Sequence, residues 1–159
     1  MVTVRPGTAA EVPAVAEVWR AAWHDGHRGH VPAALLAARD AAYFRARAAA
    51  MVDGTLVAVD GDGRIAGVVI VSDDEVFQLA VDRSTRRGGV GGLLLAAAEA
   101  RIAAGHDRAW LAVVPGNAPA RAFYARHGWT DGGPLSYAAP TATGPLPVPV
   151  RRYTKALAR

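Results

Sequence analysis

One stretch of the sequence, residues 78–95, limits what this chain can fold into more than any other. Apolar residues at its start predict a β-strand, the run from Leu93 predicts a helix, and the turn between them holds four glycines in five positions. Glycine lets backbone N–H groups converge on one point because no Cβ stands in the way. A helix that begins there adds unpaired N–H donors and the positive end of its dipole. The stretch therefore predicts a binding site for a phosphate or pyrophosphate, where Arg86 and Arg87 supply positive charge.

Length and composition predict a single globular domain. The chain has 159 residues, of which 52% are hydrophobic and 20% charged, which fits one core and excludes a disordered chain. It has no cysteine, which excludes disulfides, thiolate metal sites and a cysteine nucleophile. The first six residues contain no apolar signal core, and no apolar run approaches the length of a membrane span. We therefore expect a cytoplasmic protein with no membrane partner.

The basic character of the chain raises the question of nucleic-acid binding. The formal charge is +4, yet Lys155 is the only lysine among the 18 basic residues, and the arginines are spread over the whole chain. No run of basic residues with interleaved aromatic side chains occurs. The sequence therefore predicts no nucleic-acid partner.

The order of apolar segments predicts a mixed sheet with helices on its faces, in the α+β or three-layer α/β class. Gly26 and Gly29 predict that the helix before them ends near His24. The predicted strands cover residues 2–5, 55–60, 64–72, 75–81, 109–114, about 135–137 and 150–155. The predicted helices cover residues 8–24, 32–51 with an interruption allowed near Asp40, 90–104 and 119–127.

Several kinds of phosphate site share a glycine-rich turn at a helix start, and the spacing of the residues separates them. A P-loop needs a lysine and a hydroxyl residue after its last glycine, and neither occurs here. The dinucleotide fingerprint needs a third glycine where this chain has Leu94, and it follows the first strand of a βαβ unit, not a meander. A plain turn that caps a helix would need fewer glycines and no arginines.

Two motifs together resemble the GNAT superfamily of N-acetyltransferases. The spacing Arg86-x-x-Gly89-x-Gly91 is similar to the family's Gln/Arg-x-x-Gly-x-Gly/Ala, which binds the pyrophosphate of acetyl-coenzyme A. Residues 117–129 are similar at every fixed position to the family's Asn-x-x-Ala-x-x-Phe-Tyr-x-x-x-Gly-Phe/Trp. The order of the strands and both chain ends add to the likeness, which covers nearly the whole chain.

The resemblance implies a fold and a cosubstrate. The fold would be a mixed, mostly antiparallel sheet of six or seven strands flanked by four helices, and the cosubstrate would be acetyl-coenzyme A, with no metal. The fourth and fifth strands would separate, and the pantetheine arm would pair with the fourth strand like an added strand. A backbone N–H near Leu79 or Ala80 would polarise the thioester oxygen. The expected coenzyme-binding residues are Leu79, Ala80, Val81, Arg86, Arg87, Gly88, Gly89, Val90, Gly91, Gly92, Asn117 and Tyr124.

The resemblance also implies catalytic roles. Tyr124 would be the general acid that protonates the departing thiolate. The alternative role for Tyr124 is that of an aromatic core residue beside Phe123. Asn117 would contact the pantetheine arm, a role compatible with capping the helix that follows. Glu75, at the entry of the fourth strand, would be the general base. The apolar Phe77 two positions on leaves the direction of Glu75 open, and a chain of water molecules is the alternative base.

A histidine cluster precedes the second predicted helix. His24, His27 and His30 have spacing that suggests a metal site, but the glycines between them interrupt a helix and no carboxylate pair completes a ligand shell. In the resembling family this segment borders the acceptor site. We therefore expect His24, His27 and Arg28 to contact the acceptor, and the proline-rich segment 139–149 to cover its other side.

These expectations combine into one function. The chain would transfer the acetyl group of acetyl-coenzyme A directly to a primary amine of a small molecule, peptide or protein, since no cysteine can carry an acetyl intermediate. A non-catalytic acyl-coenzyme A-binding module with the same fold is the alternative. Dimers are common in the resembling family, so a homodimer is left open. The sequence does not name the amine.

Overall fold

The computed structural model describes residues 1–85, 88–141 and 143–158. The strands are β1 Thr3–Pro6, β2 Thr55–Val59, β3 Ile65–Ser72, β4 Glu75–Val81, β5 Arg108–Val113, β6 Thr130–Ala139 and β7 Leu146–Ala156. The α-helices are α1 Val12–His27, α2 Ala33–Ala38, α3 Ala41–Ala50, α4 Val90–Ala103 and α5 Ala118–Arg126.

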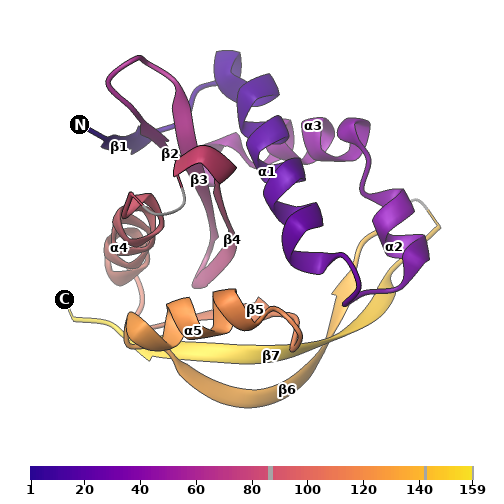
Figure 1. Cartoon of the computed structure of the whole chain (residues 1–159). Coiled ribbons are helices and arrows are strands. Elements are labelled where there is room, and N and C mark those ends of the chain that lie inside the picture. Colours follow the sequence, from indigo (N-terminus) through magenta and orange to yellow (C-terminus); the bar gives the residue numbers. More distant parts are fainter. Residues whose placement is uncertain (86–87, 142, 159) are drawn as a thin grey trace.

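The strands form one sheet in the order β1-β2-β3-β4-β5-β7-β6, with helices on both faces (Figure 1). Neighbouring strands are antiparallel except β4 and β5, which are parallel. This arrangement confirms the predicted fold class. Each face of the sheet carries its own apolar core, one beneath α4 and the other beneath α1 and α3. No helix in the described part of the chain is long and apolar enough to cross a membrane.

The interruption that the sequence allows near Asp40 is present. The segment 32–51 forms two helices, because Asp40 caps α3 by accepting a hydrogen bond from the Tyr43 N–H at 2.8 Å. The described residues therefore contain five α-helices, not four. The predicted end of α1 near His24 is also wrong, since the helix continues through Gly26 to His27. A Cβ at Gly26 would lie 2.8 Å from the Asn117 side chain, so close packing here outweighs the low helix propensity of glycine.

The centre of the sheet is irregular in two places that shape the candidate site. Strands β4 and β5 pair at Glu75 and Trp110 and at no other position in the described residues, which confirms the predicted separation of these strands. Strand β4 also contains a bulge: Ile70 of β3 pairs with Gln78, and the next residue of β3 pairs with Val76, so Phe77 has no partner. A bulge changes which face of the sheet the following side chains point to.

Candidate active site

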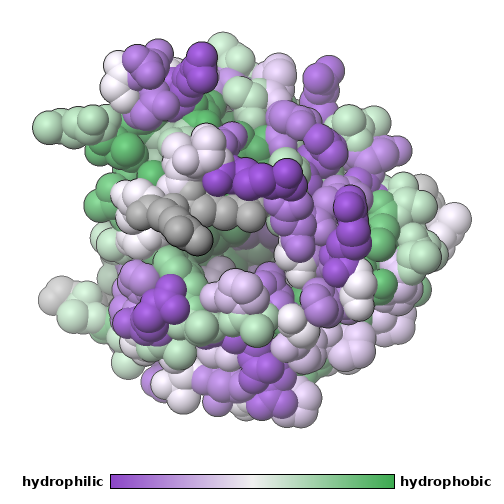
Figure 2. Space-filling view, in the orientation of Figure 1, coloured by the Kyte–Doolittle hydropathy of each residue, from purple (hydrophilic) through white to green (hydrophobic). Residues whose placement is uncertain are grey.

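A cavity of about 110 Å³ opens where β4 and β5 separate. Residues 76–80 of β4 form one wall, and Asn117, Ala120 and Tyr124 form the opposite wall. Leu79 and Ala80 thus line the cavity, and the sequence predicts that a main-chain N–H near them contacts the thioester oxygen. Figure 2 shows the molecular surface hollowed at the centre of this face, between α1 and α5. We call this space the donor cavity.

The glycine-rich turn leads directly into α4. Gly89 has a φ of 77°, a left-handed conformation that glycine adopts without a steric penalty. The first helical hydrogen bond runs from the Leu93 N–H to the Gly89 carbonyl at 3.2 Å. The N–H groups of Val90, Gly91 and Gly92 come before it and have no acceptor within the helix. This helix start has the donor arrangement that an anion requires.

The described turn residues Arg83 and Gly88 make contacts within the protein. The two predicted arginines at 86–87 lie outside the described residues. Gly88 donates its N–H to the Thr85 carbonyl at 3.0 Å, so this donor is already used within the turn. Arg83 forms an ion pair with Asp25 of α1 at 2.5 Å, which ties the turn to the end of that helix.

Two of the glycines also let α4 and α5 approach each other. A Cβ at Gly91 would lie 3.2 Å from the Phe123 ring, and a Cβ at Gly92 would lie 3.1 Å from the His127 ring. The second motif therefore packs against the first. Part of the glycine requirement comes from this contact between helices and not from a ligand.

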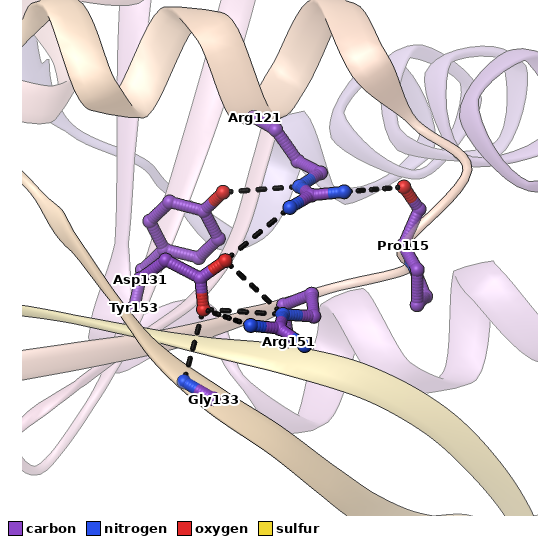
Figure 3. A network of polar contacts seen from close by, with 6 residues as sticks. All are labelled: Pro115, Arg121, Asp131, Gly133, Arg151 and Tyr153. Atoms are coloured by element: carbon purple, nitrogen blue, oxygen red, sulfur yellow. Dashed lines mark hydrogen bonds and ion pairs between the residues drawn. The ribbon is translucent and has the colours of Figure 1, made fainter.

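Helix α5 is held in place through its N-terminal half. Asn117 caps it by accepting a hydrogen bond from the Ala120 N–H at 3.3 Å. Arg121 donates to the Tyr153 hydroxyl at 3.1 Å and to the Pro115 carbonyl at 3.0 Å. It also pairs with Asp131 at 3.3 Å, as the network in Figure 3 shows. These contacts fix the helix against β6 and β7.

Tyr124 lies one turn beyond this anchor and lines the donor cavity. Its ring contacts Phe123, Trp129 and Tyr153, with ring centroids between 5.4 and 6.3 Å apart. Burial raises the pKa of Tyr124 above the ordinary 10 of a phenol. The side chain is therefore neutral at physiological pH and can donate its proton in a hydrogen bond.

A second cavity, of about 90 Å³, lies beneath α1, α2 and α3. We call it the acceptor cavity. It shares part of its wall with the donor cavity, including Trp19, His27 and Gln78. Both aliphatic and aromatic side chains line the rest of the acceptor cavity, and Glu75 and Arg39 are the acidic and basic side chains among them.

Glu75 faces the acceptor cavity. Burial raises the pKa of its carboxyl from 4.5 to about 7, while a hydrogen bond from the Tyr137 hydroxyl at 3.4 Å lowers it and the nearby charge of Asp74 raises it. Val76, the next residue, packs into the opposite core. The bulge at Phe77 then lets both Phe77 and Gln78 line the same cavity as Glu75.

The three residues predicted to contact the acceptor lie in different environments. His27 lines both cavities, and its ring stacks on Trp23 at 4.2 Å. Its Nδ1 lies 2.7 Å from the Trp23 carbonyl, which only accepts, so Nδ1 carries the hydrogen and Nε2 has a free lone pair. Burial lowers the pKa of His27 to about 4. His24 donates from Nε2 to the Arg39 carbonyl at 2.6 Å and lines neither cavity, and Arg28 is exposed.

Two cavity-lining residues carry no recognisable sequence signal. Arg39 is only 4% exposed and lines the acceptor cavity. Trp19 is 2% exposed, and its indole N–H has no hydrogen-bond partner in the described residues. The sequence shows each as an ordinary position, because only the packing of α1 and α2 brings them to the cavity. In the part of the chain that the structure describes, no group of three His, Cys, Asp or Glu side chains could hold a metal ion.

Comparison with known proteins agrees with this geometry. The sequence profile of the acetyltransferase (GNAT) family matches residues 12–129. The chain belongs to the GNAT family. Proteins of this family are in general acyl-coenzyme A-dependent N-acyltransferases. A search of curated protein sequences gave no match.

Solved structures share the GNAT fold over nearly the full chain. A GCN5-related N-acetyltransferase from Rhodopseudomonas palustris matches with a TM-score of 0.76 at 21% identity, over 98% of this chain and 95% of that one. PaiA N-acetyltransferase from Thermoplasma acidophilum, in complex with coenzyme A, gives 0.74 at 16% identity, over 98% and 99%. A phosphinothricin acetyltransferase from Sinorhizobium meliloti, in complex with acetyl-coenzyme A, gives 0.72 at 18% identity, over 99% and 89%.

Proposed function

We propose that this protein transfers the acetyl group of acetyl-coenzyme A directly to a primary amine. The observation that carries the proposal is the pair of cavities that share a wall at Gln78, one between the separated strands and one beneath α1. A donor and an acceptor can therefore meet in one ternary complex. The GNAT relatives that bind coenzyme A or acetyl-coenzyme A support the choice of donor.

The donor would enter with its pyrophosphate at the turn before α4. The N–H groups of residues 90–92 and the positive end of the helix dipole would bind the phosphate oxygens. The pantetheine arm would lie in the donor cavity beside the main chain of β4, near Asn117. The thioester would then stand near Leu79 and Ala80, where a main-chain N–H stabilises the negative charge that develops on its oxygen.

Proton transfers would complete the reaction. An aliphatic amine is mostly protonated at neutral pH, so a base must first remove a proton. Glu75 lines the acceptor cavity and would be this base, since its pKa is raised to about 7. His27 lines both cavities, but its pKa of about 4 would make it a weaker base. The amine nitrogen then forms a bond to the acetyl carbon, the C–S bond breaks, and the nitrogen releases a second proton, which balances the proton delivered to the sulfur. Tyr124 would hydrogen-bond the departing sulfur and supply its proton.

Two measurements test this proposal. Isothermal titration should detect acetyl-coenzyme A binding, and absence of binding at millimolar concentration would refute the donor assignment. An assay for released thiol across a panel of primary amines should then detect turnover. Tight binding of acetyl-coenzyme A with no turnover on any amine would instead identify a non-catalytic acyl-coenzyme A-binding module.

A further inference from the structure

Two strong hydrogen-bond donors lie on the wall of the acceptor cavity. Arg39 contributes a guanidinium, and Trp19 contributes a buried indole N–H without a partner in the described residues. Among the described residues, Glu75 is the one carboxylate on the cavity wall, and its raised pKa leaves it partly neutral at pH 7. Buried donors without acceptors are costly, so a ligand that brings acceptor oxygens would remove that cost.

Arg39 is the decisive residue. Its side chain is 4% exposed, and no carboxylate of the described residues lies within ion-pair distance of it. One of its nitrogens, Nη1, donates to the Pro140 carbonyl at 2.5 Å. The guanidinium lies 4.1 Å from the centroid of the Tyr43 ring and 5.7 Å from that of Trp23. These contacts hold a buried cation in a fixed position and leave the rest of its donors for another partner.

The main chain also fixes Arg39. Its N–H donates to the Leu35 carbonyl at 3.1 Å, and its carbonyl accepts from His24 Nε2 at 2.6 Å. A second cation, Arg47, lies near enough to depress the pKa of Arg39, after the larger effect of burial. The Nε of Arg47 is buried and has no partner in the described residues, and its guanidinium lies 5.5 Å from the centroid of the Phe77 ring. This end of the cavity therefore carries positive charge. That charge repels any positively charged group that the acceptor has besides its amine, even though the walls are aromatic.

We propose that the acceptor is a small amino acid, whose amine meets the thioester while its carboxylate binds Arg39. The cavity of about 90 Å³ is smaller than the roughly 150 Å³ that holds a benzene molecule, so the side chain of the amino acid must be small. A peptide or protein N-terminus has no carboxylate beside its amine and would not satisfy Arg39. This inference rests on the proposed acetyl transfer to an amine and narrows its substrate class.

The substrate-side experiment compares small amino acids with their own carboxamides in the thiol-release assay. The carboxamide keeps the shape and the amine but removes the negative charge. A charge-assisted pair of this kind predicts a kcat/KM about tenfold to a hundredfold higher for the acid. The carboxamide also lowers the basicity of its amine, so rates are compared per concentration of unprotonated amine. On that basis, equal or better turnover of the carboxamides by the wild-type protein would overturn the inference and leave the proposed acetyl transfer intact.

The protein-side experiment uses Arg39→Gln, which keeps a donor for the Pro140 carbonyl and removes the charge. The ratio of acid to carboxamide should fall about tenfold to a hundredfold, because only the acid pairs a full negative charge with Arg39. The kcat/KM of each substrate is compared between wild type and variant. Because the amine is the same in both measurements, its basicity does not affect this comparison. Arg45→Gln, on the exposed side of α3, is the matched control and should change neither substrate. An equal loss for acid and carboxamide would contradict the role of Arg39.

Two further measurements separate the possible failures. Circular dichroism and acetyl-coenzyme A binding test whether Arg39→Gln is folded. If the variant does not fold, the preference of the wild-type protein between acid and carboxamide decides whether the inference holds. If no amine is acetylated, the proposed function fails, and calorimetric titration of amino acids into the coenzyme-A-bound protein still tests the anion site. Binding of the acids and not of the carboxamides would support that site. Absence of binding by either would overturn it.

Discussion

Replacing Glu75 with glutamine should stabilise the protein at high pH. Burial raises the pKa of this carboxyl from 4.5 to about 7 in the folded state, whereas the unfolded chain ionises near 4.5. Below pH 4.5 the group is neutral in both states and carries no penalty. As pH rises towards 7, the unfolded chain releases the proton more readily, so folding loses stability, and above pH 7 the full penalty applies.

The size of this effect follows from the two pKa values. A difference of about 2.5 corresponds to about 3 kcal/mol, and the partial exposure of the side chain reduces this to about 1–3 kcal/mol. Glutamine has the same shape and no charge, so it removes the penalty. For a domain of this size, the melting temperature of Glu75→Gln should exceed that of the wild type by about 2–12 °C at pH 8. The two proteins should melt at nearly the same temperature at pH 4.

Thermal denaturation followed by circular dichroism from pH 4 to pH 8.5 measures the difference. Glu17→Gln is the matched control, because the hydrogen bond from Arg20 lowers the pKa of this exposed carboxyl on α1. The control should show no gain in stability at pH 8. Two results would refute the destabilising burial of this carboxylate. One is a melting-temperature difference between Glu75→Gln and wild type that stays constant over pH, and the other is a lower melting temperature of the variant at pH 8.

Three other substitutions test the site and its support. Tyr124→Phe should lower kcat about tenfold to a hundredfold and leave the calorimetric affinity for acetyl-coenzyme A unchanged, whereas an equal loss in both contradicts an acid role. Gly91→Ala should lower stability by about 1–3 kcal/mol and weaken acetyl-coenzyme A binding, because its Cβ would lie 3.2 Å from the Phe123 ring. Gly105→Ala, which meets nothing within 4 Å, is its neutral control in the same denaturant titration. Leu94→Ala, at a fully buried position of α4, should cost about 2–5 kcal/mol of unfolding free energy, and a cost below 1 kcal/mol would contradict a tightly packed core.

Much of the fold could be predicted from the sequence because its signals are local. Apolar periodicity, the positions of glycine and proline, and capping residues predict the succession of helices and strands along the chain, the turn before α4 and the cap at Asn117. The end of α1 was predicted wrongly at His24. Local propensity counts Gly26 as a helix breaker, but the contact between its backbone and Asn117 comes from a distant part of the chain.

The candidate site divides in the same way. The sequence by itself determined the glycine-rich start of α4 and the motif that carries Asn117 and Tyr124, since these depend on residue types at fixed spacing. Only the tertiary structure decided the direction of Glu75, because the bulge at Phe77 depends on how β4 pairs with β3. It also decided the place of Arg39, which reaches the cavity through the packing of α1 against α2 and α3. Burial, cavity shape and pKa arise from contacts between residues far apart in the chain, and no local pattern encodes them.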